Sequence, residues 1–289
     1  MISVLIRDTK FWLLSTTAGL TAIYFTLMWF ADDTGHLVMS ALFFGCAAIL
    51  LWEKRHSLSI KQNRVSVILG LVLIGWMLRH SSLETIEYLV RLFPAVLALG
   101  MGLVASGWYG LKQYWQELLL LFCLSVPSTV AYYLIDISPL TAQASSLLLW
   151  YSGFDVSLNG VVLSLPDGQP IRVVYECSGI DMVLYMFGLS VICLVMFPIK
   201  GAGKVIFSLV AIAVGFLLNS VRIAMLVVLF GVDQDAFNKW HTGTGSYTFA
   251  MIGVIILGII YWVLLKLDAN PRQSELAQFP EINSEPDLY

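Results

Sequence analysis

Charged residues are scarce in this sequence. Asp, Glu, Lys and Arg make up only 12% of its 289 residues, whereas 58% are hydrophobic. A soluble globular domain carries about 25% charged residues, so this composition argues against a water-soluble fold. The net charge of −3 and the dispersed Lys and Arg residues provide no basic surface, and we therefore set nucleic acid aside as a partner.

Cysteine and histidine are also few, with four of each. Cys46, Cys123 and Cys193 fall within apolar runs, where a thiol usually behaves as a small hydrophobic group. The histidines are scattered, and no Cys or His pair has the spacing of metal ligands. The sequence thus predicts neither a metal site nor a cofactor, and it leaves Cys177 as the one cysteine at the edge of an apolar run.

The sequence does contain a series of apolar runs of roughly twenty residues, each able to cross about 30 Å of hydrocarbon. We expect an all-α integral membrane protein with about eight transmembrane helices. The predicted spans cover residues 11–30, 37–52, 65–78, 89–106, 118–135, 180–197, 205–230 and 246–265. The polytopic membrane domain is assigned to residues 1–267, and the polar tail 268–289 is expected to be disordered.

The distribution of Lys and Arg predicts the orientation, because cytoplasmic loops hold the excess of these residues. If the N-terminus is inside, the inside segments hold Arg7, Lys10, Lys54, Arg55, Lys61, Arg64, Lys112, Lys200, Lys204, Lys266 and Arg272. The outside loops and the adjoining span ends hold only Arg79, Arg91, Arg172 and Lys239. Both termini, including the tail, are therefore predicted to be cytoplasmic.

This orientation places the longest loop, residues 136–176, outside the membrane. Apolar strands at 156–158 and 161–165 flank Asn159-Gly160, the dipeptide preferred in type I′ hairpins. A third strand at 171–175 follows a Pro-Asp-Gly turn signal. We expect a small extracytoplasmic β-meander before the sixth span, serving either as a structural plug or as part of a site. Residues 140–151 are predicted to form an amphipathic helix along the membrane surface.

Cys177 ends this outer segment, just where the sixth span begins. A helix N-terminus directs free N–H groups and partial positive charge at this position, and that setting lowers a thiol pKa. Ser178 and Gly179 let the backbone approach a carbonyl group closely, so their amides are candidate oxyanion donors. The alternative is an inert thiol at a helix cap.

Arg222 lies inside the seventh predicted span. A charged residue there costs at least about 2.5 kcal/mol on insertion scales and usually faces a cavity or a partner. Asn219 lies one turn away on the same face, where it can hold the guanidinium or a substrate amide. The alternative is a structural arginine bonded to backbone carbonyl groups.

His241 lies in the predicted outer loop before the last span, and an imidazole can take up and return a proton near neutral pH. A solvated surface histidine is the alternative for His241 alone. The predicted topology, however, places Cys177, Arg222 and His241 towards the same leaflet, and none of the three was used to derive it. This shared position predicts one site that contains all three residues.

Three short motifs resemble, in order, those of the exosortase/archaeosortase family. They are Cys177-Ser178-Gly179, Asn219 to Arg222, and His241 followed by Gly245 and Phe249. The resemblance covers about residues 90–265, and the motifs are concentrated between residues 175 and 250.

The resemblance implies a membrane cysteine peptidase or transpeptidase of the EC 3.4.22 type. Cys177 is then the nucleophile, Arg222 the transition-state stabiliser and His241 the general acid and base. Asn219, Ser178 and Gly179 are supporting residues. By analogy with soluble sortases, which use the same residue types on an unrelated fold, the resemblance also implies cleavage of C-terminal sorting signals through a thioacyl intermediate. The expected partners are membrane lipid, an unidentified acceptor and secreted proteins that end in a short motif, a transmembrane helix and a basic segment. The expected location is the inner membrane of the cell.

Two other functions remain open on the residues alone. A transporter or flippase would also place a costly arginine beside a polar pathway, and a cysteine-dependent membrane acyltransferase would use a different acyl donor. Asp181 departs from the family pattern, because related sequences often have a basic or neutral polar residue at this position. A carboxylate one turn after Cys177 would oppose thiolate formation. It either orients His241 or complements the helix N-terminus, and we expect the latter. Glu176 raises the same question more weakly.

Overall fold

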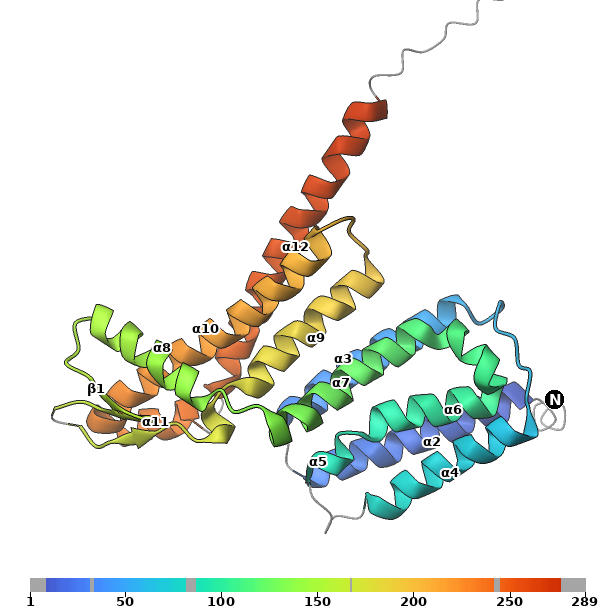
Figure 1. The fold of residues 1–289 in the computed structure, drawn as a ribbon, viewed down its shortest axis with the longest axis horizontal. Helices are drawn as coiled ribbons and strands as arrows, with labels where there is room; N and C mark the ends of the chain where they lie inside the picture. The colour runs from blue at the N-terminus through green and yellow to red at the C-terminus, as the bar shows by residue number, and fades with distance from the viewer. Residues whose placement is uncertain (1–8, 32–33, 82–86, 167, 242–244, 277–289) are drawn as a thin grey trace, which may run out of the picture.

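A helix occupies each of the predicted spans in the computed structural model, which describes residues 9–31, 34–81, 87–166, 168–241 and 245–276 (Figure 1). These helices are α2 (Thr9–Phe30), α3 (Thr34–Glu53), α4 (Arg64–His80), α6 (Phe93–Gly110), α7 (Trp115–Leu134), α9 (Ile180–Met196), α10 (Gly203–Val232) and α12 (Ser246–Leu276). The short helix α5 (Glu87–Val90) precedes α6. Long apolar runs become helices because a bilayer offers no water to hydrogen-bond an open backbone.

Five helical stretches among the described residues are long and apolar enough to cross a membrane. They are Thr9–Phe30, Thr34–Glu53, Phe93–Ala131, Gly203–Val232 and Tyr247–Asp268. The third stretch contains both α6 and α7, which pack against each other because the chain turns at Gly107 (φ 68°) and the 3-10 helix η1 (Leu111–Tyr114). Helix α9 is apolar but shorter. The total of eight spans therefore remains a prediction.

The N-terminal half is a group of helices with an apolar interior. Helices α2, α4 and α6 pack around one core, and α3 lies along α7 beside them (Figure 1). Tyr24, Met77 and Phe93 are almost fully buried in that core. Gly70 of α4 meets α6 at backbone level, since a Cβ there would lie 2.5 Å from the carbonyl oxygen of Gly100. Small residues permit such close helix contacts in membranes.

The C-terminal half is built along α10. Helices α8 (Ser138–Tyr151), α9 and α12 pack against α10, and α11 (Gln234–His241) lies beside its C-terminal end (Figure 1). Ala142 and Leu149 of α8 are buried in the same cluster as Ile223 of α10. The hydroxyl of Ser145 donates to the backbone oxygen of Ser220 over 2.9 Å. One face of the predicted amphipathic helix is thus packed on α10, and its position relative to the membrane surface remains a prediction.

A three-stranded antiparallel meander is present, in the order β1 (Ser157–Asn159), β2 (Val162–Ser164) and β3 (Ile171–Arg172). The predicted turn is wrong by one residue, since Asn159 pairs with Val162 and leaves Gly160 and Val161 as the loop. Gly160 has φ 63°, which suits the first loop position of a type I′ or II′ turn. The third strand is shorter than predicted, because the chain then forms the 3-10 helix η2 (Tyr175–Cys177). The extracytoplasmic position of the sheet remains a prediction.

Helix α12 continues to Leu276, so residues 268–276 of the tail are helical instead of disordered. A residue added to an existing helix gains a hydrogen bond without the cost of a new nucleus. The rest of the predicted disordered tail, residues 277–289, lies outside the described residues.

Candidate active site

The structure brings the side chains of Cys177 and His241 together. The Cys177 Sγ lies 3.7 Å from the Nε2 of His241, across a sequence separation of 64 residues. The cysteine ends η2, and the histidine is the last residue of α11. An imidazole at this separation can take up a thiol proton, because nucleophile–base contacts are often long before substrate binds.

Arg222 holds the histidine through its backbone. Its Nη2 donates to the carbonyl oxygen of His241 over 2.8 Å. Its Nε is buried and has no hydrogen-bond partner within the described chain. Arg222 thus fixes the end of α11 and retains one N–H donor in the interior of the site.

The cysteine turn depends on Gly179 and Asn219. Gly179 has φ 85°, a conformation that L side chains rarely adopt. A Cβ at Gly179 would also lie 2.3 Å from Cγ and Nδ2 of Asn219. The Asn219 amide fills this space and donates from Nδ2 to the carbonyl oxygen of Cys177 over 3.1 Å. Asn219, predicted to hold Arg222 or a substrate amide, therefore positions the cysteine.

The backbone amides of the turn are mostly committed to internal hydrogen bonds. The Ser178 amide donates to the oxygen of Tyr175 over 3.0 Å, so it is not a free oxyanion donor. The Ile180 amide donates to the Ser178 hydroxyl over 3.3 Å. This leaves the Gly179 amide, among the described amides from Cys177 to Ile180, as the candidate donor.

Thr141 of α8 is a further contact that sequence reasoning missed. Its hydroxyl donates to the backbone oxygen of Ser178 over 2.6 Å, and both residues are fully buried. No local pattern signals this role, because α8 reaches the turn only through tertiary packing.

His241 lies at a helix end and not, as predicted, in a loop. Asp233 Oδ1 accepts from the amides of Asp235 and Ala236 and so caps the start of α11, which is the usual role of an aspartate at this position. The Phe237 ring, one turn earlier, stacks on the imidazole with centroids 5.1 Å apart. The orientation of the imidazole is therefore set by a helix and an aromatic neighbour.

The remaining motif residues support α11 from the start of α12. The ring of Phe249 lies 5.9 Å from that of Trp240. A Cβ at Gly245 would meet the same tryptophan at 2.8 Å. Residues 242–244 of this motif lie outside the described residues.

The pKa of the Cys177 thiol shifts in the opposite direction to the one predicted. Burial raises the pKa of the Cys177 thiol, and the nearby Arg222 charge offsets this only in part, while Glu176 adds to it. The expected lowering by a helix N-terminus is therefore wrong, because α9 begins three residues later, at Ile180, and desolvation dominates. Burial and the Arg222 charge lower the pKa of His241. Both shifts favour a neutral thiol beside a neutral imidazole.

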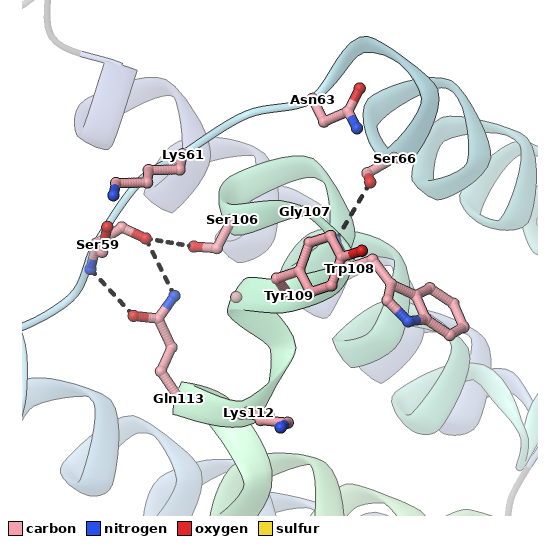
Figure 2. A pocket seen from close by; sticks show the side chains of 11 residues that line it. Ser59, Lys61, Asn63, Ser66, Ser106, Gly107, Trp108, Tyr109, Lys112 and Gln113 are labelled. Carbon is pink, nitrogen blue, oxygen red and sulfur yellow. Dashed lines mark hydrogen bonds between the residues drawn. The ribbon is translucent and has the colours of Figure 1, made fainter.

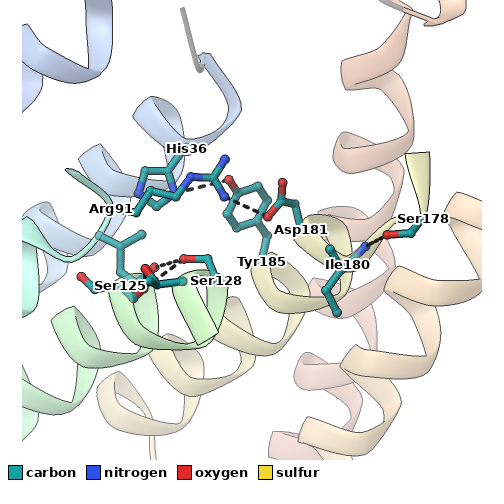
Figure 3. Close-up of polar contacts among 10 residues, drawn as sticks. His36, Arg91, Ser125, Ser128, Ser178, Ile180, Asp181 and Tyr185 are labelled. Carbon is teal, nitrogen blue, oxygen red and sulfur yellow. Dashed lines mark hydrogen bonds and ion pairs between the residues drawn. The ribbon is translucent and has the colours of Figure 1, made fainter. Parts of the chain in front are cut away.

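Asp181 is directed towards the N-terminal half. Its Oδ1 lies 3.1 Å from the Nη1 of Arg91, and the pair joins α9 to the segment before α6 (Figure 3). Asp181 also sits in the first turn of α9, as expected for a carboxylate that complements a helix N-terminus. Within the part of the chain that is described, no group of three His, Cys, Asp or Glu is placed to hold a metal ion.

Residues 11–258 match the family model of the transmembrane exosortases, a range that contains the cysteine turn, α10 and α11. No curated protein and no solved structure matches the chain. Because the match covers most of the sequence and the membrane-spanning helices are present, the chain is an integral membrane protein that belongs to the transmembrane exosortase family.

Proposed function

We propose that this protein cleaves C-terminal sorting signals of secreted proteins at the outer face of the inner membrane, through a thioacyl intermediate on Cys177. The observation that carries the proposal is the 3.7 Å contact between the Cys177 Sγ and the His241 Nε2. Family membership supports a membrane enzyme that processes sorting signals in general, and this contact supplies a nucleophile and a base for it.

In the first half-reaction, the neutral imidazole of His241 takes the proton of the Cys177 thiol as sulfur attacks the scissile carbonyl carbon. The tetrahedral intermediate collapses when the protonated imidazole gives its proton to the leaving amine. The C–N bond breaks, a thioester forms, and the apolar helix with its basic end is released.

Two donors are available for the oxyanion. The Arg222 Nε is buried without a partner among the described residues, and its guanidinium is close enough for its charge to act on the Cys177 thiol. The Gly179 amide lies two residues beyond Cys177 at the break before α9. Donors already in place in a water-poor site stabilise developing charge without reorganisation.

In the second half-reaction, His241 takes a proton from an incoming nucleophile, which attacks the thioester carbon and displaces the Cys177 sulfur. An amine on an envelope component gives transpeptidation, and water gives hydrolysis. In both cases the proton returns from the imidazole to the sulfur, so the site is regenerated.

The decisive experiment is the Cys177→Ala substitution, assayed with a co-expressed secreted protein that ends in an apolar helix and a basic segment. We expect processing, measured as a mass shift of this protein, to fall by more than about 10³-fold, because no other group can form the thioester. Cys193→Ala is the matched control, since Cys193 is a second half-buried free cysteine near the other end of α9.

Full processing by the Cys177→Ala variant would refute the nucleophile assignment. Mass spectrometry of the acid-quenched wild-type enzyme then identifies the adduct on Cys177. A peptide adduct supports the proposal, whereas a fatty acyl adduct would assign an acyltransferase. Transport activity that survives Cys177→Ala, without any adduct, would assign a transporter.

A further inference from the structure

A cavity of about 460 Å³ lies far from the cysteine. It opens between the segment that joins α3 to α4 and the turn that joins α6 to α7 (Figure 2). Helix α7 leads from this turn towards α8 and has 20 residues, a length of about 30 Å at 1.5 Å per residue. The cavity is therefore at the opposite end of the helical bundle from the Cys177–His241 pair.

The walls of the cavity are held by specific hydrogen bonds. The Gln113 side chain accepts from the Ser59 amide over 3.0 Å and donates to the Ser59 oxygen over 3.1 Å. The Ser106 hydroxyl donates to that same oxygen over 2.8 Å. Gly107, with φ 68°, breaks α6, and the following amide of Trp108 donates to the Ser66 hydroxyl over 3.2 Å. The site is thus formed before any ligand binds.

The charge of the lining is positive. Lys61 and Lys112 both line the cavity, and no Asp or Glu does (Figure 2). Among the ion pairs of the described residues, neither lysine has a carboxylate, whereas Lys54 nearby is paired with Glu117 at 2.7 Å. Two uncompensated ammonium groups beside serine and asparagine side chains fit an anion with several oxygen atoms.

The surrounding aromatic residues place the cavity at the level of lipid headgroups. Trp108 is 64% exposed and Tyr109 is 92% exposed, and both line the cavity. Trp52 and Trp115, at the ends of α3 and α7 on the same side, are exposed as well. Exposed Trp and Tyr side chains at helix ends mark the membrane–water interface. The predicted orientation assigns this end to the cytoplasmic leaflet, where anionic lipids concentrate.

We propose that this cavity binds the phosphate group of an anionic phospholipid. Lys61 and Lys112 supply the charge, the hydroxyls of Ser59 and Ser66 and the Asn63 side-chain amide supply hydrogen bonds, and Trp108 and Tyr109 contact the glycerol and upper acyl region. The proposal is independent of the sorting-signal chemistry, because none of these residues belongs to the cysteine site.

The test uses the full chain, purified in detergent, delipidated and titrated with dioleoylphosphatidylglycerol or dioleoylphosphatidylcholine in native mass spectrometry. We expect wild-type protein to prefer phosphatidylglycerol. The double variant K61Q/K112Q should lose about 25-fold in affinity for it, since each lysine near an anionic surface contributes about fivefold. K61R/K112R retains both charges and should bind within about threefold of wild type.

K200Q/K204Q is the matched control, because it removes two exposed lysines at the start of α10 and in the loop before it, on the same predicted side. Thermal unfolding of each variant without lipid verifies folding. Equal phosphatidylglycerol binding by wild type and K61Q/K112Q would overturn the site. If inorganic phosphate competes at equal concentration and phosphatidylglycerol has no advantage over phosphatidylcholine, the cavity binds the free anion and the lipid assignment is wrong.

Discussion

The two halves of the molecule use close glycine contacts for different purposes. In the N-terminal half, Gly70 of α4 approaches the carbonyl oxygen of Gly100 on α6, so the glycines bring two helices together. In the C-terminal half, Gly179 makes room for the side chain of Asn219, which holds the oxygen of Cys177. The first contact stabilises helix packing, whereas the second fixes the position of one reactive group. Activity should therefore be most sensitive to small changes in the C-terminal half.

Among the substitutions that test this comparison, Gly179→Ala has the largest expected effect on stability and activity together. A non-glycine residue at φ 85° costs about 1–2 kcal/mol, and the new methyl group would meet Asn219 at 2.3 Å, which adds about 1–3 kcal/mol of overpacking. Displacement of the Asn219 amide should also reduce substrate processing by about 100-fold or more. Thermal unfolding in micelles and the mass-shift assay measure the two effects.

Gly153→Ala is the matched control for this comparison. Gly153 has φ 88°, but nothing lies within 4 Å of its added Cβ. The Gly153→Ala variant should lose only the stability that the positive φ costs a non-glycine residue, about 1–2 kcal/mol. Its activity should stay within about twofold of wild type. The double variant Gly179→Ala/Asn219→Gly should regain the stability lost to overpacking but not that lost to the positive φ, and it should not regain activity, because the clash and the hydrogen bond to Cys177 are both removed. Equal behaviour of the two alanine variants would show that the Asn219 contact is unimportant.

A second, smaller effect concerns the charge state of the cysteine site. Burial raises the pKa of Cys177 from 9.0, and burial and Arg222 lower the pKa of His241 from 6.5. In the His241→Ala background, alkylation of Cys177 by iodoacetamide should therefore still accelerate above pH 9.0. In the wild type, processing should be lost only as the pH falls through a His241 pKa below 6.5, where the imidazole becomes protonated and cannot accept the thiol proton.

Two charge variants in the same His241→Ala background sharpen this test. The Arg222 charge lowers the pKa of Cys177, so Arg222→Gln should slow alkylation at fixed pH by about three- to tenfold. Glu176 raises that pKa more weakly, so Glu176→Gln should accelerate alkylation by about two- to threefold. In the enzyme with His241 intact, an alkylation midpoint well below 9.0 would indicate a thiolate–imidazolium pair and contradict the neutral pair.

The helices were largely predictable, because an apolar segment in a bilayer must satisfy its backbone hydrogen bonds internally and a helix does so. The hairpin was predictable except for its register. Asn159-Gly160 is the stronger turn signal, but pairing Leu158 with Leu163 and Leu163 with Ile171 leaves Leu163 fully buried. The observed loop differs from the predicted one by one position, so every cross-strand partner changes by two residues and each side chain keeps its face. The alternating apolar pattern therefore could not decide between the two registers.

The proximity of Cys177, Arg222 and His241 was predictable, but the surroundings of these residues were not. Asp233 is a typical N-cap residue, and this signal in the sequence could have predicted a helix that includes His241. The contact of Thr141 with Ser178 and the burial of the Cys177 thiol arise from tertiary packing, which a linear pattern does not record. The direction of the thiol pKa was consequently mispredicted from local helix position alone.

The smallest expected effect tests the link between the two halves. Asp181 is bonded to Arg91 at 3.1 Å, and the Asp181 and Arg91 side chains are 49% and 11% exposed. Because the carboxylate is largely in solvent and Asn keeps an oxygen that can accept from the guanidinium, removal of the charge should cost about 0–1 kcal/mol. Asp181→Asn should therefore change stability by less than about 1 kcal/mol and processing by less than about threefold. Asp155→Asn, at an exposed loop position, is the control and should have an equally small effect. If Asp181 instead orients the imidazole, Asp181→Asn should reduce kcat by about 10⁴-fold, as loss of the third member of a catalytic triad does. A loss of that size, with unchanged unfolding temperature, would assign Asp181 to the reaction and not to the contact between the halves.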